Sequence, residues 1–166
     1  MDAGDKITLV SSDNEKFELS TKASKRSVLI NKMIEDYQDK TEFPVNNVNK
    51  KNLQKIVQYL EHYENTNPTN PQAPLPPKGF QNCVESWDFE FLPTELEDVF
   101  ELIQGANFMD IQPLMELTAA KIADVIRNKT ADDIRTTFNI KNDFTKEEEE
   151  QMIKGDKWKV DEIGEN

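Results

Sequence analysis

The sequence predicts an α/β fold, and two observations about the spacing of its apolar residues predict it. Near the amino terminus, apolar and polar residues alternate, which is typical of half-buried β-strands. In the second half of the chain, apolar residues recur every three or four positions, which indicates amphipathic helices. Strands therefore come first and helices last, without a visible repeat, in a chain of 166 residues that can bury one good core.

The first predicted element is a β-hairpin around the turn-forming pair Asp13-Asn14. Its alternating apolar positions are Ile7, Leu9, Phe17 and Leu19. Helical spacing of apolar residues then predicts a helix over 27–37, and residues 43–45 indicate an extended segment around a proline.

A second helix is predicted over 49–63, where Leu53, Ile56, Val57 and Leu60 lie at the i, i+3, i+4, i+7 positions of one face. The following segment, 65–82, is rich in proline and asparagine. Five of the eight prolines of the chain fall in it, namely Pro68, Pro71, Pro74, Pro76 and Pro77. This composition favours a flexible linker or a long loop.

Two helices are predicted after this segment. A short one over 85–91 carries three aromatic residues, and a longer one follows Thr94, which forms a capping-box pattern with Glu97. We expect Gly105 to loosen the end of the longer helix. The short helix holds Trp87, Phe89 and Phe91.

A long helix is predicted next, with Asp110 as its cap and Pro113 in its tolerant first turn. Leu117 is expected to fall to one side of the main apolar stripe. The helix is nearly apolar on more than one side, so two interpretations stay open: a central core helix, or a groove that receives a partner helix. The stripe consists of Ile111, Leu114, Met115, Thr118, Ile122, Val125 and Ile126.

The carboxy-terminal segment carries two further capping-box patterns, Thr130 with Asp133 and Thr145 with Glu148. They predict short helices that carry Ile134 and Phe138, and then Met152 and Ile153. The segment is too short for a domain of its own, so its large apolar groups must close a core or hold a partner. These groups are Phe138, Ile140, Phe144 and Trp158.

The formal net charge of −12 argues against binding to nucleic acids or anionic membranes, because both require a surplus of Lys and Arg. A protein partner with basic patches is expected instead. No basic residue lies between Lys78 and Lys121, which predicts a solvated acidic face or a surface that steers a partner. The acidic residues there are Glu85, Asp88, Glu90, Glu95, Glu97, Asp98, Glu101, Asp110 and Glu116.

The single cysteine, Cys83, cannot form an internal disulfide, so a reducing compartment is expected. Residues 1–10 contain no apolar core long enough for a signal peptide, and no segment approaches the length of a membrane span. We therefore expect a cytoplasmic and nuclear protein.

The residues that carry chemistry do not predict an enzyme. Nucleophilic catalysis needs a base, and the only imidazole, His62, lies at the polar edge of a predicted helix. Too few ligands exist for a zinc site, residues 139–143 lack the central glycine of a calcium loop, and helix geometry separates the carboxylates of 147–150. No glycine-rich phosphate loop is present. We expect no catalytic residues, no cofactor, no metal and no small-molecule substrate.

Many separated blocks of the sequence form a characteristic series. The blocks are Ser11-Ser12-Asp13, Phe17-Glu18, Ser27-Val28, Met33-Ile34-Glu35-Asp36, Asn47-Val48-Asn49, Trp87-Asp88, Glu90-Phe91-Leu92, Phe100-Glu101-Leu102-Ile103, Ala106-Asn107, Asp110-Ile111, Lys129-Thr130, Ile134-Arg135, 137–145, 147–149 and Trp158. Taken together, they closely resemble the Skp1 family, the adaptor subunit of cullin-type ubiquitin ligases. The resemblance covers the chain apart from the proline-rich segment and the last few residues.

The resemblance implies a BTB/POZ-like domain followed by a carboxy-terminal helical extension that interlocks with the F-box of a substrate receptor. On this basis, 1–64 is the amino-terminal part of the BTB/POZ-like domain, 65–83 the linker or loop, and 84–127 the helical remainder with the long helix. The F-box-binding helices and tail span 128–166. The implied function is that of a non-catalytic adaptor between F-box proteins and a cullin scaffold.

By position, the resemblance places cullin-binding residues at Asn107 and Phe108. The chain departs from the family pattern at Phe108, which replaces a common Tyr, at Ala119, which replaces a common Cys, and at Ala131, which replaces a proline that some lineages hydroxylate. In the tail, Lys157-Trp158-Lys159 replaces a more acidic surround. The implied F-box-binding residues are Met115, Ala119, Ile122, Ile126, Phe138, Ile140 and Trp158.

Two other functions stay open. The first is a structural subunit that uses the same F-box-binding surface outside ubiquitin ligation, for example in a kinetochore or pump-assembly complex, and the loss of the hydroxyl at Phe108 motivates it. The second is a self-associating BTB-like domain.

Overall fold

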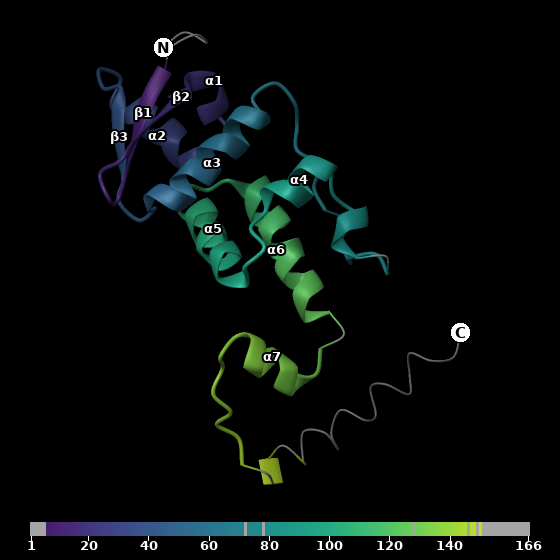
Figure 1. Cartoon of the computed structure of the whole chain (residues 1–166). Helices are drawn as coiled ribbons and strands as arrows, with labels where there is room; N and C mark the ends of the chain where they lie inside the picture. Colours follow the sequence, from purple (N-terminus) through teal and green to yellow (C-terminus); the bar gives the residue numbers. More distant parts are fainter. Residues whose placement is uncertain are drawn as a thin grey trace. The chain divides into compact units, whose positions relative to one another are not determined.

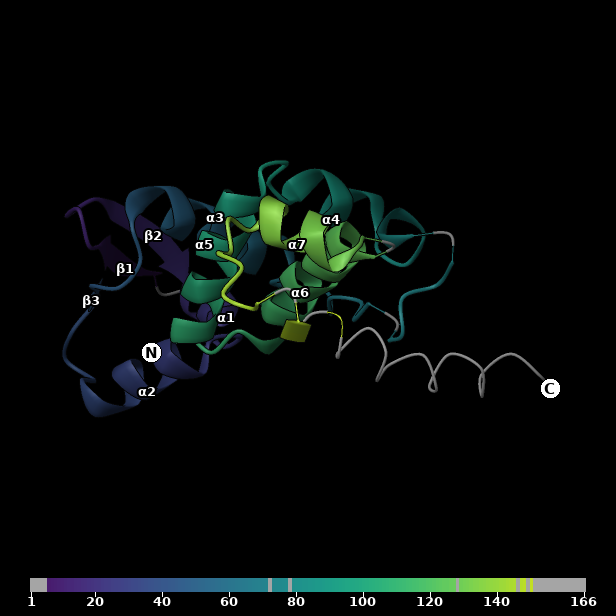
Figure 2. The ribbon, with the colours of Figure 1, turned by 90° about the horizontal axis from the view of Figure 1, so that it is seen from below.

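A computed structural model describes residues 6–71, 73–77, 79–127, 129–145, 147–148 and 150 of the chain (Figure 1). The fold is mixed α/β, as predicted. The chain divides into two compact units, one that ends at Arg127 and one that begins at Asn128. In both views of the first unit, the sheet lies at one end with α3 beside it, and α5 and α6 follow (Figures 1 and 2).

The sheet contains the predicted hairpin. Strands β1 (Lys6–Ser11) and β2 (Lys16–Ser20) pair antiparallel, and Asn14 takes the left-handed conformation, φ 63°, that the turn requires. The extended segment predicted over 43–45 is β3 (Glu42–Val45), which pairs parallel with the other edge of β1. The strand order is therefore β2-β1-β3, and every second residue of β1 from Ile7 is buried.

Side-chain caps fix the helices of the amino-terminal half. Ser20 caps the short α1 (Thr21–Ser24), Ser27 caps α2 (Val28–Asp36), and Asn49 caps α3 (Lys50–His62). The two predicted helices thus form close to their expected bounds. The apolar face of α3 is buried against the sheet and α5, and it includes Leu53, Ile56, Val57 and Leu60.

The proline-rich segment forms a long connection between α3 and α4 (Ser86–Phe91). Among its described residues, Phe80 belongs to the hydrophobic core. The end of the connection forms a 3-10 turn, η1 (Phe80–Asn82), in which the Phe80 side chain is buried. Arg26 donates hydrogen bonds to the carbonyl oxygens of Tyr63 and Thr66 at the start of the connection. Near both of its ends, the connection is therefore held against the rest of the first unit.

The predicted short aromatic helix is α4 (Ser86–Phe91), and its residues Trp87 and Phe91 pack against Tyr59 of α3. The longer helix is α5 (Leu96–Phe108), but the predicted capping box of Thr94 and Glu97 is wrong. Glu95 is the N-cap, without a side-chain hydrogen bond, and two acidic residues lie in the first turn. Acidic groups at that end stabilise the helix through its macrodipole.

Gly105 does not loosen α5, so that prediction is also wrong. The helix continues through it to Phe108. A Cβ atom at this position would lie 3.0 Å from Cδ1 of Ile56 and 3.5 Å from Cγ1 of Val48. The close approach of α5 to α3, and to the segment before α3, therefore explains why this position is a glycine.

Asp110 does not cap the next helix, α6 (Gln112–Ile126), contrary to the prediction. It takes a left-handed conformation, φ 52°, in the corner between α5 and α6, which aspartate tolerates better than most residues. Ile111 is the N-cap, without a side-chain hydrogen bond, and Pro113 lies in the first turn as predicted.

The buried side of α6 differs from the predicted stripe. Leu117 was expected at the flank, but it is buried together with Leu114 and Thr118. Beyond Thr118, no described residue of α6 is fully buried, and the side chain of Ile126 is exposed. The core interpretation therefore holds for the amino-terminal half of α6, while the other half keeps apolar groups near solvent.

The absence of basic residues between Lys78 and Lys121 predicted an acidic surface there. Asp88 is an exception, because its side chain is buried and the residue is only 1% exposed. Its Oδ1 accepts a hydrogen bond of 2.8 Å from the hydroxyl of Tyr63. Burial raises the pKa of the Asp88 carboxyl, and the nearby Glu85 also raises it, while the bond from Tyr63 and the charge of His62 oppose them.

The substitution Asp88→Asn is expected to make the fold less dependent on pH. A raised pKa in the folded chain stabilises the fold below the ordinary aspartate pKa of about 3.9, and this contribution is lost as the pH rises through the raised value. Asparagine keeps the acceptor oxygen for Tyr63 but carries no charge. In urea unfolding, the variant should gain stability relative to the wild type between about pH 4 and pH 7.

The control for this change is Glu90→Gln, which removes one charge from the exposed side of the same helix. A difference between Asp88→Asn and the wild type that stays constant across that pH range would contradict the prediction.

In the second unit, helix α7 (Ala131–Thr137) begins at the predicted capping box. The Thr130 side chain accepts from the Asp133 amide, and the Asp133 side chain accepts from the Thr130 amide. The same reciprocal bonds join Thr145 and Glu148, so this prediction is also confirmed. Phe138 lies just after α7 rather than within it. Met152 and Ile153 lie outside the described residues.

Candidate functional site

Four of the predicted F-box-binding residues lie on one side of α6. They follow one another at intervals of four, three and four residues, which matches the helical period of 3.6. Ala119 and Ile126 are exposed, with Ile126 at 37%, whereas two of the four are half-buried. The structure therefore brings together an apolar face, the α6 face, that consists of Met115, Ala119, Ile122 and Ile126.

The predicted cullin-binding residues lie at the carboxyl end of α5. Asn107 is exposed and Phe108 is half-buried. The corner that follows them is closely bonded, because the Met109 carbonyl accepts 2.5 Å from the Ser27 hydroxyl and the Ala106 carbonyl accepts 2.9 Å from the Ile111 amide. The corner is thus held in a defined position by α2 and by its own backbone bonds.

The apolar residues of the second unit are accessible. None of the described residues between Lys129 and Glu150 is fully buried. Ile140 is 55% exposed and Phe144 is 43% exposed, while Phe138 is half-buried. These residues therefore do not form a core within the described part of this unit. Trp158, the last predicted F-box-binding residue, lies outside the described residues.

Local bonds order the segment around Ile140. The Ile140 amide donates 2.8 Å to the Arg135 carbonyl, and the Arg135 guanidinium lies 6.0 Å from the centre of the Phe144 ring. Asn139 takes a left-handed conformation, φ 50°, which turns the chain after α7. The turn and these contacts hold Ile140 exposed beside α7.

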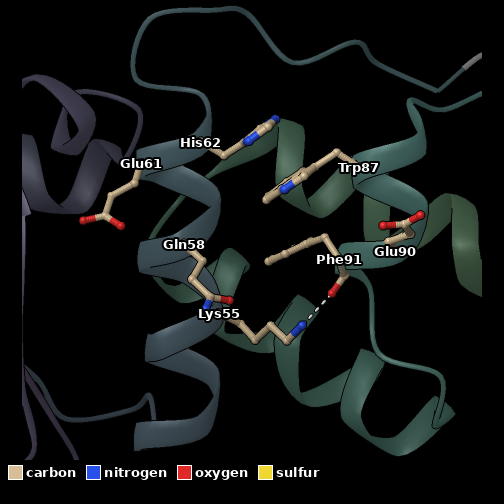
Figure 3. A pocket seen from close by; sticks show the side chains of 7 residues that line it. All are labelled: Lys55, Gln58, Glu61, His62, Trp87, Glu90 and Phe91. Atoms are coloured by element: carbon tan, nitrogen blue, oxygen red, sulfur yellow. Dashed lines mark hydrogen bonds between the residues drawn. The ribbon is translucent and has the colours of Figure 1, made fainter.

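An open pocket of about 620 Å³ lies between α3 and α4 (Figure 3). His62 stacks on Trp87 at 3.6 Å between ring centres, and Trp87 stacks on Phe91 at 4.8 Å. Lys55 completes the stack, because its Nζ lies over the Phe91 ring and donates 2.6 Å to the Phe91 carbonyl. The pocket is lined by Lys55, Gln58, Glu61, His62, Trp87, Glu90 and Phe91.

This stack gives two polar residues of the pocket, His62 and Lys55, a packing role. The imidazole of His62 covers one face of Trp87, and the Lys55 ammonium is bonded to the backbone of α4. The sequence interpretation named His62 only as an isolated imidazole. The signal that could have found the cluster is the aromatic spacing of four residues at Trp87 and Phe91, opposite Tyr59 and Tyr63 on α3.

Within the described part of the chain, no group of three or more His, Cys, Asp or Glu residues could hold a metal ion. Burial and the charge of Asp124 raise the pKa of the Cys83 thiol, which opposes the reactive thiolate. None of the helices in the described ranges combines the length and the apolar character of a membrane span.

Comparison with known proteins matches two regions of the chain to models of one family. Residues 5–65 match the model described as "Skp1 family, tetramerisation domain", and residues 112–159 match "Skp1 family, dimerisation domain". The second region includes α6, α7 and the exposed apolar residues after it. The two matches confirm the predicted fold class.

Curated relatives match along nearly their whole length. A protein of Tetrahymena thermophila named "S-phase kinase-associated protein 1 homolog" is 44% identical over 95% of this chain and 96% of its own. "E3 ubiquitin ligase complex SCF subunit sconC" of Arthroderma otae is 35% identical over 96% of this chain and 97% of its own. "Suppressor of kinetochore protein 1" of Schizosaccharomyces pombe is 38% identical over 94% of this chain and 98% of its own.

Proposed function

The chain belongs to the Skp1 family, and from this premise we propose that it is a non-catalytic adaptor that bridges F-box substrate receptors to a cullin scaffold in an SCF-type E3 ubiquitin ligase. The observation that carries the proposal is the near full-length match to relatives named as Skp1 and as an SCF subunit. An adaptor needs two separate surfaces and no reaction centre. The α6 face and the end of α5 supply candidates for the two surfaces.

The F-box protein is proposed to bind the α6 face together with the exposed residues of the second unit. Large apolar groups such as Ile126 and Ile140 are each worth about 1.5–3 kcal/mol when they are fully buried. A partner that covers either of them would gain this energy, and binding of a partner helix to an apolar surface is a common recognition mode. The contact residues in this proposal are Met115, Ala119, Ile122, Ile126, Phe138, Ile140 and Trp158.

The cullin is proposed to bind at Asn107 and Phe108. The bonded corner after α5 supports this assignment, because a surface that is fixed before binding loses little conformational entropy. Phe108 offers an aromatic ring without a hydroxyl, so its contribution to cullin binding is apolar. The net charge of −12 suits a partner with basic patches and predicts binding that weakens as salt is added.

An alternative function is that of a structural subunit that binds F-box proteins without a cullin. Two points favour it: the resemblance implies that Phe108 replaces a tyrosine common in the family, and one relative is named for the kinetochore. The two functions share the F-box-binding surface and differ only at the end of α5.

Affinity purification of the chain from its native cell is expected to recover F-box proteins and a cullin together. The substitution Ile140→Glu should remove the F-box proteins and leave the cullin, since it places a charge in an apolar contact. The substitution Asn107→Arg should remove the cullin and leave the F-box proteins. Bound chains are identified by mass spectrometry.

Recovery of F-box proteins without a cullin would favour the structural subunit, and recovery of neither would reject both functions.

Trp158→Ala gives a second test of the F-box surface, because loss of a buried aromatic anchor costs about 2 kcal/mol or more. Light scattering of the purified chain at micromolar concentration tests self-association, and a monomer would count against that third function.

A further inference from the structure

The carboxyl-terminal half of α6 needs a support that its own burial does not provide. Beyond Thr118, the described residues of this helix are half-buried or exposed. Helix ends with few buried contacts open locally at low cost in free energy. Ile122 and Ile126 of the α6 face lie in this half, so the order of these last two turns decides whether the face is ready for a partner.

The proline-rich connection contacts this half of α6 from behind. The Phe80 amide donates a hydrogen bond of 3.0 Å to Oδ1 of Asp124. The Arg127 guanidinium donates to the carbonyl oxygen of Pro76. Lys121 lies 5.7 Å from the centre of the Phe80 ring and 5.3 Å from that of Phe89. We name this set the back bracket, and it consists of Pro76, Gly79, Phe80, Lys121, Asp124 and Arg127.

The connection side of the back bracket is anchored in the first unit. Phe80 is 1% exposed, and its ring packs against Phe89 of α4. Gly79 takes a φ of 87°, which lets the chain turn, and a Cβ there would lie 3.4 Å from Oδ1 of Asp124. Its amide also donates 3.0 Å to the Pro76 carbonyl, the same oxygen that Arg127 contacts. The bracket therefore ties α6 to a buried side chain.

The bracket and the α6 face lie on opposite sides of the helix. With 3.6 residues per turn, Asp124 is rotated by about 200° from Ile122 and by about 200° from Ile126. Lys121 and Arg127 flank Asp124 at three-residue intervals. A partner on the α6 face would therefore leave the bracket untouched, and the bracket would leave the face open.

We infer that the back bracket positions the carboxyl-terminal half of α6 for partner binding, so that the proline-rich connection supports the F-box-binding surface from behind. Asp124 is its main positioning residue, because its side-chain oxygen accepts the hydrogen bond from the amide of the buried Phe80. The inference rests on the proposed function for the identity of the partner, but the ordering of the helix does not depend on it.

The substitution Asp124→Ala is expected to weaken binding of a purified F-box domain about tenfold in calorimetry. If a variant leaves the last turns of α6 formed for only a tenth of the time, the apparent Kd rises tenfold. Amide hydrogen exchange of Val125, Ile126 and Arg127 in the free chain should also speed up, because the last turns of the helix are then open for most of the time. Alanine has the higher helix propensity, so faster exchange cannot come from propensity.

Two matched variants separate positioning from charge. Asp124→Asn removes the same charge but keeps an acceptor oxygen for the Phe80 amide. This variant should therefore retain most of the wild-type affinity and most of the protection of the α6 amides against hydrogen exchange. Glu116→Ala removes another carboxylate from α6, one whose recorded hydrogen-bond partner is the Gln112 side chain, and it should match the wild type. All four proteins are compared as full chains.

An Asp124→Ala variant with wild-type affinity would overturn the inference, even with faster exchange. Equal losses in Asp124→Ala and Asp124→Asn would also overturn it, because charge alone would then explain the effect. If the wild type binds no F-box domain, the proposed function fails, and unchanged exchange in Asp124→Ala would separately reject the bracket.

Discussion

The substitution Ile126→Glu is expected to weaken binding of a purified F-box domain about a hundredfold or more and to leave the fold intact. Burying an unpaired charge costs several kcal/mol, and about 2.8 kcal/mol corresponds to a factor of one hundred in Kd. Ile126 is 37% exposed in the free chain, so the charge stays in water until a partner covers it. Binding is measured by calorimetry and folding by thermal unfolding.

The matched control is Gln54→Glu, which adds the same charge at an exposed position of α3. It should bind like the wild type, because α3 contributes no residue to the α6 face. Equal affinities of the two variants would show that the α6 face is not the binding surface. A large drop in the melting temperature of Ile126→Glu alone would mean that Ile126 belongs to the core.

Local chemistry made much of the fold predictable from the sequence. The spacing of the four apolar residues of α3 and the capping box of Thr130 with Asp133 both act within a few residues, and both were predicted correctly. The turn at Asn14 is of the same kind. In each case the pattern itself lies within a few positions along the chain, so the sequence shows it even where, as in α3, the apolar face packs on distant elements.

Apart from the capping box of Thr94 and Glu97, the wrong predictions concern residues whose roles depend on how the folded chain is arranged around them. Leu117 was placed at a flank because periodicity gives the apolar sides of a helix but not which side faces the core. Asp110 suited an N-cap locally, yet the close corner between α5 and α6 requires a left-handed residue there. Phe80 lies in a segment of linker composition, and only the folded chain shows its burial.

The candidate site is predictable from sequence to a smaller extent. The apolar residues of α6 were identified by spacing and by family resemblance, but their exposure could not be, because that depends on where the core ends. The back bracket was not predicted from the sequence. The pattern that could have indicated it is a set of polar residues at three-residue intervals opposite the apolar face, namely Lys121, Asp124 and Arg127.

The substitution Gly105→Val is expected to lower the free energy of unfolding by about 2–3 kcal/mol, the upper part of the range for overpacked cores. A Cβ at this position would already lie 3.0 Å from Cδ1 of Ile56, and the two Cγ atoms of valine would extend toward Val48. The Ile56 methyl could yield to a single methyl group, but a branched side chain must push α5 away from α3.

The displacement of α5 should reach the end of the helix, where Asn107 and Phe108 follow within one turn. Cullin binding is therefore expected to weaken in Gly105→Val even where the protein is still folded. Gln104→Val is the matched control, since it places the same side chain on the exposed side of α5. Urea unfolding that gives equal stabilities for the two variants would mean that α3 and α5 are not closely packed at Gly105, and that glycine is there for another reason.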